Sequence, residues 1–117
     1  MDDLRLDAVF LNVSDIELSR RFYGELLGLP LQIEPDDHSS VYALGEVSLV
    51  VHAHDEHAGT SPPGIEDPGA TVLFLAVDDV DRAVEELRGA GVTISQEPVD
   101  QPWGARDAAV LDPDGYE

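Results

Sequence analysis

The amino-acid sequence predicts an α+β fold built from two tandem copies of one strand–helix–strands unit. Two segments that match in position and chemistry indicate the duplication: Val13-Ser14-Asp15-Ile16 and Val77-Asp78-Asp79-Val80. Each follows an apolar run of strand length and precedes apolar residues at helical spacing, so both mark a strand-to-helix junction. The same element order occurring twice indicates an internal repeat. We therefore expect one domain over residues 1–117, with a first module at about 5–54, a linker at 55–69 and a second module at about 70–117.

The first module opens with an apolar run at residues 6–13, which we expect to be a strand. Ser14 followed by Glu17 has the spacing of a capping box, which satisfies the free amide groups at a helix start. The apolar stripe of the helix that follows recurs every fourth residue: Leu18, Phe22 and Leu26. Gly28 is expected to end the helix in a left-handed conformation. Three further strands are predicted, at residues 31–34, 40–44 and 47–53.

The second module repeats this order after a linker rich in Gly and Pro. Residues 71–77 are its expected first strand, and Asp79 precedes a helix. The apolar residues of that helix have i, i+3, i+4, i+7 spacing: Val80, Ala83, Val84 and Leu87. The remaining predicted elements are a helix end at Gly89-Ala90-Gly91, a strand beginning at 92–94, a strand at 106–111 and a turn at 112–115. The second copy reaches Glu117 where its last strand is expected to begin.

The charge balance is the extreme feature of the composition. Six Arg and no Lys stand against 25 Asp and Glu, for a formal net charge of −19. Such a surface repels phosphate backbones and anionic lipids, so we expect neither a nucleic-acid partner nor a membrane partner. The sequence has no cysteine, no apolar run of about 18 residues and no signal-peptide pattern at its start, which favours a cytoplasmic location.

Two interpretations of the acidic surface remain open. The protein is either an ordinary soluble acidic protein or one adapted to high salt, where ions screen the self-repulsion. The absence of Lys favours adaptation to salt.

The order of three segments resembles the vicinal oxygen chelate superfamily, the group of glyoxalase I, bleomycin-resistance proteins and extradiol dioxygenases. The first segment is Val13-Ser14-Asp15-Ile16, leading into Phe22-Tyr23 and Leu27-Gly28-Leu29. The second is Val77-Asp78-Asp79-Val80, and the third is Trp103-Gly104 followed by Asp112-Pro113-Asp114-Gly115-Tyr116-Glu117. The resemblance implies two tandem βαβββ modules that form a cupped mixed sheet, with helices on the convex side and a ligand cavity on the concave side. It also implies a homodimer, because members with two modules commonly pair.

Metal-using members of that superfamily place four His, Glu or Gln ligands on inward-facing strand positions. Carried over to this sequence, the first three positions are Ala8, Val50 and Val72, and the fourth lies just beyond Glu117. Aliphatic side chains have no lone pair for a divalent cation. We therefore expect no metal at this site, and we assign no cofactor.

Alternation along the strands groups the candidate ligand contacts. Ala8, Phe10 and Asn12 share one face of their strand, and the resemblance implies that this face lines the cavity. The equivalent faces of the other strands add further candidate ligand-binding residues: Tyr42, Val50, His52, Val72 and Phe74. A lining of this kind suits an apolar or aromatic small molecule. Core packing is the competing interpretation for Tyr42.

Three further groups have both a functional and a structural interpretation. His52 and His54, with Asp55, Glu56 and His57, could hold zinc or nickel, or could be exposed loop residues. Trp103 could cover a ligand or pack as an apolar plug. Arg106 could pair with a ligand carboxylate or phosphate, or with one of the many acids of the chain.

We expect metal-independent binding of a small molecule, with no catalytic residue assigned. Without Lys no phosphate-binding Lys loop is possible, and no nucleophile-elbow sequence occurs. The first alternative is a metal-dependent lyase, isomerase or dioxygenase of the same superfamily that uses non-standard ligands such as His52. The second is a protein-interaction or regulatory module that retains only the fold.

Overall fold

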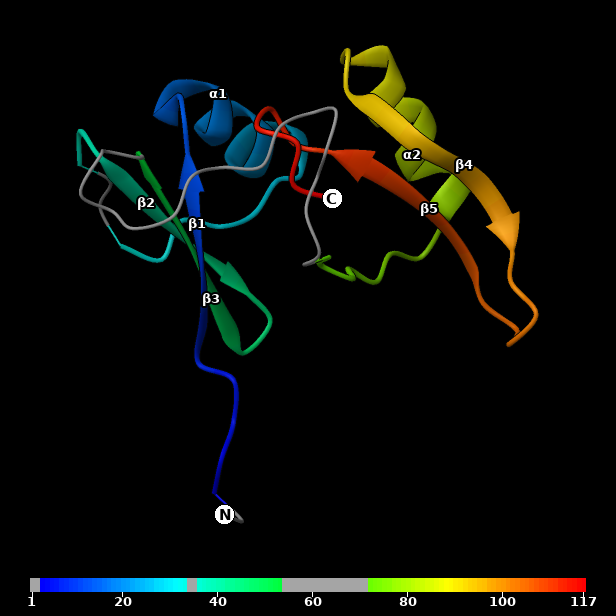
Figure 1. The fold of residues 1–117 in the computed structure, drawn as a ribbon, viewed down its shortest axis with the longest axis horizontal. Coiled ribbons are helices and arrows are strands. Elements are labelled where there is room, and N and C mark those ends of the chain that lie inside the picture. Colours follow the sequence, from blue (N-terminus) through cyan, green and yellow to red (C-terminus); the bar gives the residue numbers. More distant parts are fainter. Residues whose placement is uncertain (1–2, 34–35, 54–71) are drawn as a thin grey trace. The chain divides into compact units, whose positions relative to one another are not determined.

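The computed structural model describes residues 3–33, 36–53 and 72–117 (Figure 1). The chain divides into two compact units, Met1–Pro62 and Pro63–Glu117. The boundary falls inside the segment 55–69 that the sequence predicts as a linker. Each unit contains helix and strand, as expected for an α+β fold.

The first unit contains a mixed sheet of three strands: β1 (Ala8–Val13), β2 (Ser39–Leu44) and β3 (Val47–Ala53). The strand order is β1-β3-β2, with β1 parallel to β3 and β2 antiparallel to β3. Parallel neighbours need a crossover connection, and the helix after β1 belongs to that connection. The three predicted strands at 6–13, 40–44 and 47–53 are confirmed, although β1 begins two residues later than expected.

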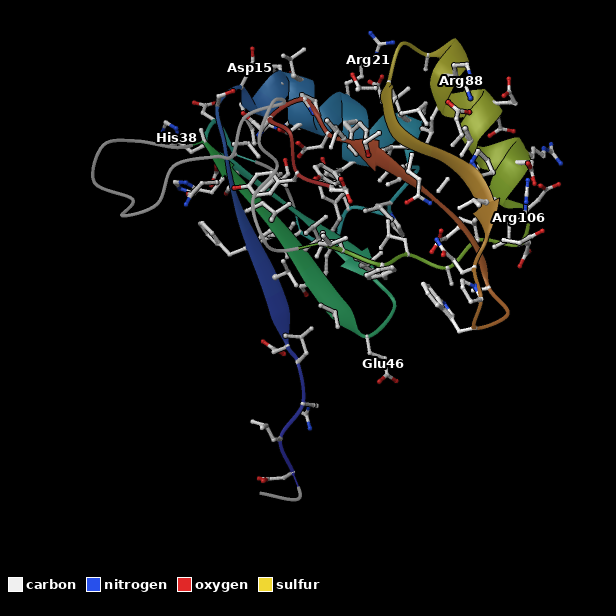
Figure 2. The ribbon with its side chains drawn as sticks, turned by 45° about the vertical axis from the view of Figure 1, so that its right-hand side comes forward. Asp15, Arg21, His38, Glu46, Arg88 and Arg106 are labelled. Atoms are coloured by element: carbon white, nitrogen blue, oxygen red, sulfur yellow. The ribbon has the colours of Figure 1, made fainter. Side chains whose placement is uncertain are left out.

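The helix after β1 is capped by Asp15, not by Ser14. α1 (Ile16–Arg20) starts with the Asp15 carboxylate accepting hydrogen bonds from the amides of Glu17 (3.0 Å) and Leu18 (3.2 Å). Figure 2 shows Asp15 at this junction, directly after β1. The predicted capping box is therefore wrong. Glu17 instead accepts from Arg20 Nη1 at 2.8 Å.

The second half of this helix is η1 (Arg21–Leu26), which has π-helical hydrogen bonding. The predicted stripe is only partly right, because the buried side of the helix is centred on a neighbouring set of residues. Phe22 is buried, but Leu18 is 52% exposed, and Ser19 and Tyr23 are buried beside Phe22. Gly28 ends the helix in the left-handed conformation (φ 71°), as predicted.

The predicted strand at residues 31–34 does not form in the described part of that segment. Leu31 makes a single antiparallel bridge to Tyr42, and residues 32–33 bend away from a strand geometry. Residue 34 lies outside the described residues. One bridge leaves the segment without the ladder of hydrogen bonds that defines a strand.

In its described residues, 72–117, the second unit contains one helix and one two-stranded ribbon. The helix is α2 (Val80–Gly89), and the strands β4 (Thr93–Asp100) and β5 (Arg106–Leu111) pair antiparallel. Asp79 caps α2 by accepting from the amide of Arg82 at 3.0 Å, as the sequence indicates. The predicted turn after β5 is confirmed, with the Gly115 amide donating to the Asp112 carbonyl at 3.0 Å. None of the helices in the described ranges is long and apolar enough to cross a membrane.

The predicted strand at residues 71–77 is wrong over 72–77, the part that the structure describes. A strand requires a neighbour that supplies ladder hydrogen bonds, as β3 does for β1. Here the Leu73 amide donates to the carbonyl of Glu117, the last residue of the sequence, at 3.1 Å. One such bond does not make a ladder. Phe74 and Val77 in this segment are 86% and 55% exposed.

Candidate ligand-binding face of the first sheet

The sheet of the first unit has two chemically different faces. One face packs under α1 and η1 (Figure 1) and holds the buried core of the unit: Leu11, Val13, Ser40, Tyr42, Leu49 and Val51. The other face, which we call the Phe10 face, holds five residues that the sequence selects as ligand contacts: Ala8, Phe10, Asn12, Val50 and His52. The register β1–β3 places Phe10 beside Val50 and Asn12 beside His52. The predicted grouping of these five residues on one face agrees with this register.

Phe10 and His52 form the aromatic centre of the Phe10 face. Their ring centroids lie 5.6 Å apart in a stacked arrangement, with 29° between the planes. Phe10 remains 57% exposed, so one side of its ring is available to another molecule. His52 is half-buried, and its Nδ1 is buried with no hydrogen-bond partner among the residues that the structure describes. A buried polar atom without a partner is costly.

The donor set on this face does not fit the metal centre of the metal-using relatives. Ala8 and Val50 stand at two of the expected ligand positions, and Val72 stands at a third, in the second unit. Over 3–33, 36–53 and 72–117 no three His, Asp or Glu side chains gather closely enough to hold a metal ion. The chemistry of the Phe10 face is that of its apolar and aromatic side chains and the His52 imidazole. The cluster His54, Asp55, Glu56 and His57 lies outside the described residues.

Tyr42 does not belong to the Phe10 face, contrary to expectation. Its β3 partner is Leu49, and both side chains lie in the core beneath the helix, Tyr42 at 2% exposed. The competing interpretation, core packing, therefore describes its position. The sequence showed strand alternation within β2 but not the register of β2 against β3, which decides the face.

The same register adds β2 and β3 residues that sequence reasoning missed. Val41 pairs with Val50, and Ala43 pairs with Ser48, so these side chains extend the Phe10 face. The signal in the sequence was the alternation along β2, which puts Val41 and Ala43 on the face opposite Ser40 and Tyr42. That pattern assigns Val41 and Ala43 to the Phe10 face only once the Tyr42 side chain is known to lie in the core.

The Arg106 side chain is engaged by the second unit itself. Its Nε and Nη2 donate to the two Asp81 carboxylate oxygens at 2.8 and 2.9 Å, and its Nη1 donates to Asp100 at 3.2 Å. This fork lowers the pKa of the Asp81 carboxyl and raises the pKa of Arg106. Arg106 therefore pairs with acids of its own chain, which is the structural alternative to recognition of a ligand carboxylate or phosphate.

The other candidates of the second unit are solvent-exposed. Trp103 lies in the turn between β4 and β5 and is 72% exposed. Val72 and Phe74 are 40% and 86% exposed. Their predicted contact with a ligand stays a prediction.

Comparison with known families assigns the chain to a class of protein. The model of the Glyoxalase/Bleomycin resistance protein/Dioxygenase superfamily matches residues 5–117. The chain belongs to this superfamily, which confirms the resemblance drawn from the sequence motifs.

The chain is similar in sequence or structure to the following three proteins over nearly its whole length. YraH of Bacillus subtilis (strain 168) is 29% identical over 118 residues, which cover 95% of this chain and 92% of YraH. The crystal structure of virulence protein STM3117 from Salmonella typhimurium is 28% identical, has a TM-score of 0.72, and the match covers 99% of this chain and 94% of that one. TnmS3, an antibiotic binding protein from Streptomyces sp. CB03234, is 29% identical with a TM-score of 0.72, and the match covers 99% of this chain and 93% of TnmS3.

Proposed function

We propose that this protein binds an apolar or aromatic small molecule on the Phe10 face, without a metal ion. The observation that supports the proposal most directly is the stacked pair of Phe10 and His52. It presents a half-exposed aromatic ring stacked on a half-buried imidazole. Sites for such ligands combine apolar walls with one or two polar groups that fix orientation.

The remaining residues of the Phe10 face support the same ligand class. Ala8 and Val50 replace metal donors with hydrocarbon, which removes a Lewis acid but leaves apolar contact surface. His52 supplies a nitrogen that can accept a hydrogen bond from a ligand hydroxyl or donate one to a ligand carbonyl. The similarity to the antibiotic binding protein TnmS3 is consistent with binding rather than catalysis.

Calorimetric titration with 2-naphthol tests the proposal. The Phe10→Ala variant removes an aromatic contact of about 0.5–1.5 kcal/mol, so we expect the Kd to rise about three- to tenfold. His52→Phe keeps an aromatic ring but removes the nitrogen, and a loss of similar size is expected. Leu18→Ala, which truncates an exposed apolar residue of α1 in the same unit, is the matched control. Equal losses in Leu18→Ala and Phe10→Ala would contradict binding at this face.

Elemental analysis separates the proposal from the metal-dependent enzyme. Protein prepared without a histidine tag is expected to contain no stoichiometric zinc, nickel, iron or manganese. A stoichiometric metal that disappears in His52→Ala would overturn the metal-independent proposal and favour a lyase, isomerase or dioxygenase.

A further inference from the structure

A pocket of about 320 Å³ lies on the helix side of the first sheet, away from the Phe10 face. The residues that line it are mainly Arg20, Gly24, Glu25, Leu29, Leu31 and Tyr42, and we call it the Tyr42 pocket. Its volume lies within the range of about 300–1,000 Å³ that is usual for small-molecule sites. Tyr42 contacts this pocket from the sheet face opposite the one that holds Phe10 and His52.

A glycine in η1 opens this pocket above the Tyr42 ring. A Cβ on Gly24 would lie 3.4 Å from the Tyr42 hydroxyl oxygen and 3.4 Å from its ring carbon Cε1. Glycine inside a helix is destabilising relative to alanine, and here it leaves space beside the phenol. π-helical turns such as η1 are rare and are often found at functional sites.

The Tyr42 hydroxyl is the polar group that the pocket offers to a ligand. Tyr42 is 2% exposed, yet its hydroxyl takes part in no hydrogen bond within the described residues. A phenol oxygen can accept one hydrogen bond and donate another. Leu29 and Leu31 supply apolar wall on the same pocket.

The charges of the pocket favour a cation. The Arg20 guanidinium is already satisfied, because it donates to Glu17 and Ser40 at 2.8 Å each and to the Ser39 carbonyl at 3.2 Å. A further Arg20 bond goes to the Asp36 carbonyl. Glu25 has no ion-pair partner among the described residues, so a negative charge remains at the pocket. The net charge of −19 raises the local concentration of cations further.

We propose that the Tyr42 pocket binds a small organic ammonium ion. The ammonium group donates hydrogen bonds to the Tyr42 hydroxyl and pairs with Glu25, and its short hydrocarbon chain contacts Leu29 and Leu31. The Tyr42 pocket is distinct from the Phe10 face, so this proposal does not depend on the proposed binding of a ligand to the Phe10 face.

Titration with hexylammonium chloride, followed by calorimetry and by the amide spectrum of the protein, tests the proposal. The titrations are run in 0.5 M NaCl, which screens non-specific attraction to the acidic surface. We expect saturable binding that shifts the Gly24 amide, weaker binding of 1-hexanol, and no binding of hexanoate. Equal affinity for hexanol and hexylammonium would overturn the assignment of a cation.

Three variants locate the site. Gly24→Ala places a methyl group in the pocket at ordinary contact distance, and we expect it to weaken hexylammonium binding about tenfold or more. Tyr42→Phe and Glu25→Gln remove the hydroxyl and the charge, and each is expected to weaken binding severalfold.

Two control variants make the same kinds of substitution outside the Tyr42 pocket. Gly89→Ala changes a helical glycine whose Cβ would meet nothing within 4 Å, and Glu46→Gln removes a charge at the β2–β3 turn (Figure 2). Both are expected to bind hexylammonium as the wild type does. Binding that is unchanged in Gly24→Ala, or reduced equally in Glu46→Gln and Glu25→Gln, would overturn the proposal. Since Gly24 is not on the Phe10 face, 2-naphthol binding in Gly24→Ala reports separately on the proposed function.

Discussion

Neighbouring residues of one strand reach chemically opposite surroundings in the first sheet. Leu49 is 1% exposed in the core under the helix, while Val50 beside it belongs to the Phe10 face. On β1, Leu11 is buried and Phe10 is 57% exposed. A one-residue change in register would exchange the two sets, because side chains alternate between faces. The direction of each side chain therefore separates residues that stabilise the fold from those available to a ligand.

Truncation on the two faces should have different effects on stability. Leu49→Ala removes fully buried side-chain atoms, and we expect the free energy of unfolding to fall by about 2–5 kcal/mol. Phe10→Ala removes a half-exposed ring, with an expected loss below about 2 kcal/mol. Urea denaturation followed by circular dichroism measures both. If Phe10→Ala destabilised the protein as strongly as Leu49→Ala, Phe10 would be a core residue and not a free ligand contact.

Ion pairs between elements hold α2 to the ribbon of the second unit. Arg106 at the start of β5 binds Asp81 in the first turn of α2, and Arg88 near the end of α2 binds Glu97 of β4 (Figure 2). Both carboxyl groups have a lowered pKa, and the arginine hydrogen bond is the largest cause in each case. The two pairs lie at opposite ends of the helix, so together they resist its rotation on the ribbon. Each is solvent-exposed, which limits its individual contribution.

The Arg106 contribution to stability should depend on pH. Asp81 has a lower pKa folded than unfolded, so its stabilisation is present above the unfolded pKa of about 4 and is lost as pH falls through the folded value. Arg106→Gln is therefore expected to lower the melting temperature at pH 7 and to have a much smaller effect near pH 3. Arg5→Gln, at a position with no ion pair in the described chain, is the control for lost positive charge. A difference between wild type and Arg106→Gln that is as large at pH 3 as at pH 7 would contradict the assigned pairing.

The acidic surface acts on the molecule as a whole. The net charge of −19 on 117 residues destabilises any compact state through self-repulsion. Arg20, Arg82, Arg88 and Arg106 are already paired with specific carboxylates, and the six Arg of the chain are far outnumbered by its 25 Asp and Glu. Dissolved ions must therefore supply much of the screening.

Stability is expected to rise with salt concentration. The Debye length falls from about 10 Å at 0.1 M to about 3 Å at 1 M, so most of the gain in melting temperature should be complete by about 1 M NaCl. Thermal melts in NaCl and KCl measure it. A flat or falling melting temperature would remove the argument for adaptation to salt.

We also propose that the protein forms a homodimer. Apolar side chains in both units are exposed, including Leu4, Leu31, Phe74 and Trp103, and a second copy would cover part of this surface. Light scattering in molar salt is expected to give about twice the chain mass of 12.6 kDa. A mass near that of a single chain would exclude the dimer at the concentration used.

Features that depend on a few consecutive residues could be predicted from the amino-acid sequence alone. The cap at Asp79, the apolar face of α2 and the left-handed Gly28 follow from local hydrogen bonding and backbone sterics, so they require no knowledge of the fold. Strands β2 and β3 and the superfamily could also be predicted, because alternation and motif order are properties of the sequence itself. Alternation groups Ala8, Phe10 and Asn12 on one face of β1 and Val50 and His52 on one face of β3, and the β1–β3 register joins the two groups.

Features that require a partner far away in the sequence were set by tertiary packing. Residues 72–77 have the composition of a strand, but a strand exists only where another segment supplies its hydrogen bonds. The sequence predicts Tyr42 as a ligand contact on the Phe10 face. The pairing of Tyr42 with Leu49 instead places its side chain in the core, where it lines the Tyr42 pocket. Arg106 has many possible carboxylate partners in an acidic chain, and the packing of α2 on the ribbon selects Asp81. Such pairings depend on contacts that no local pattern encodes.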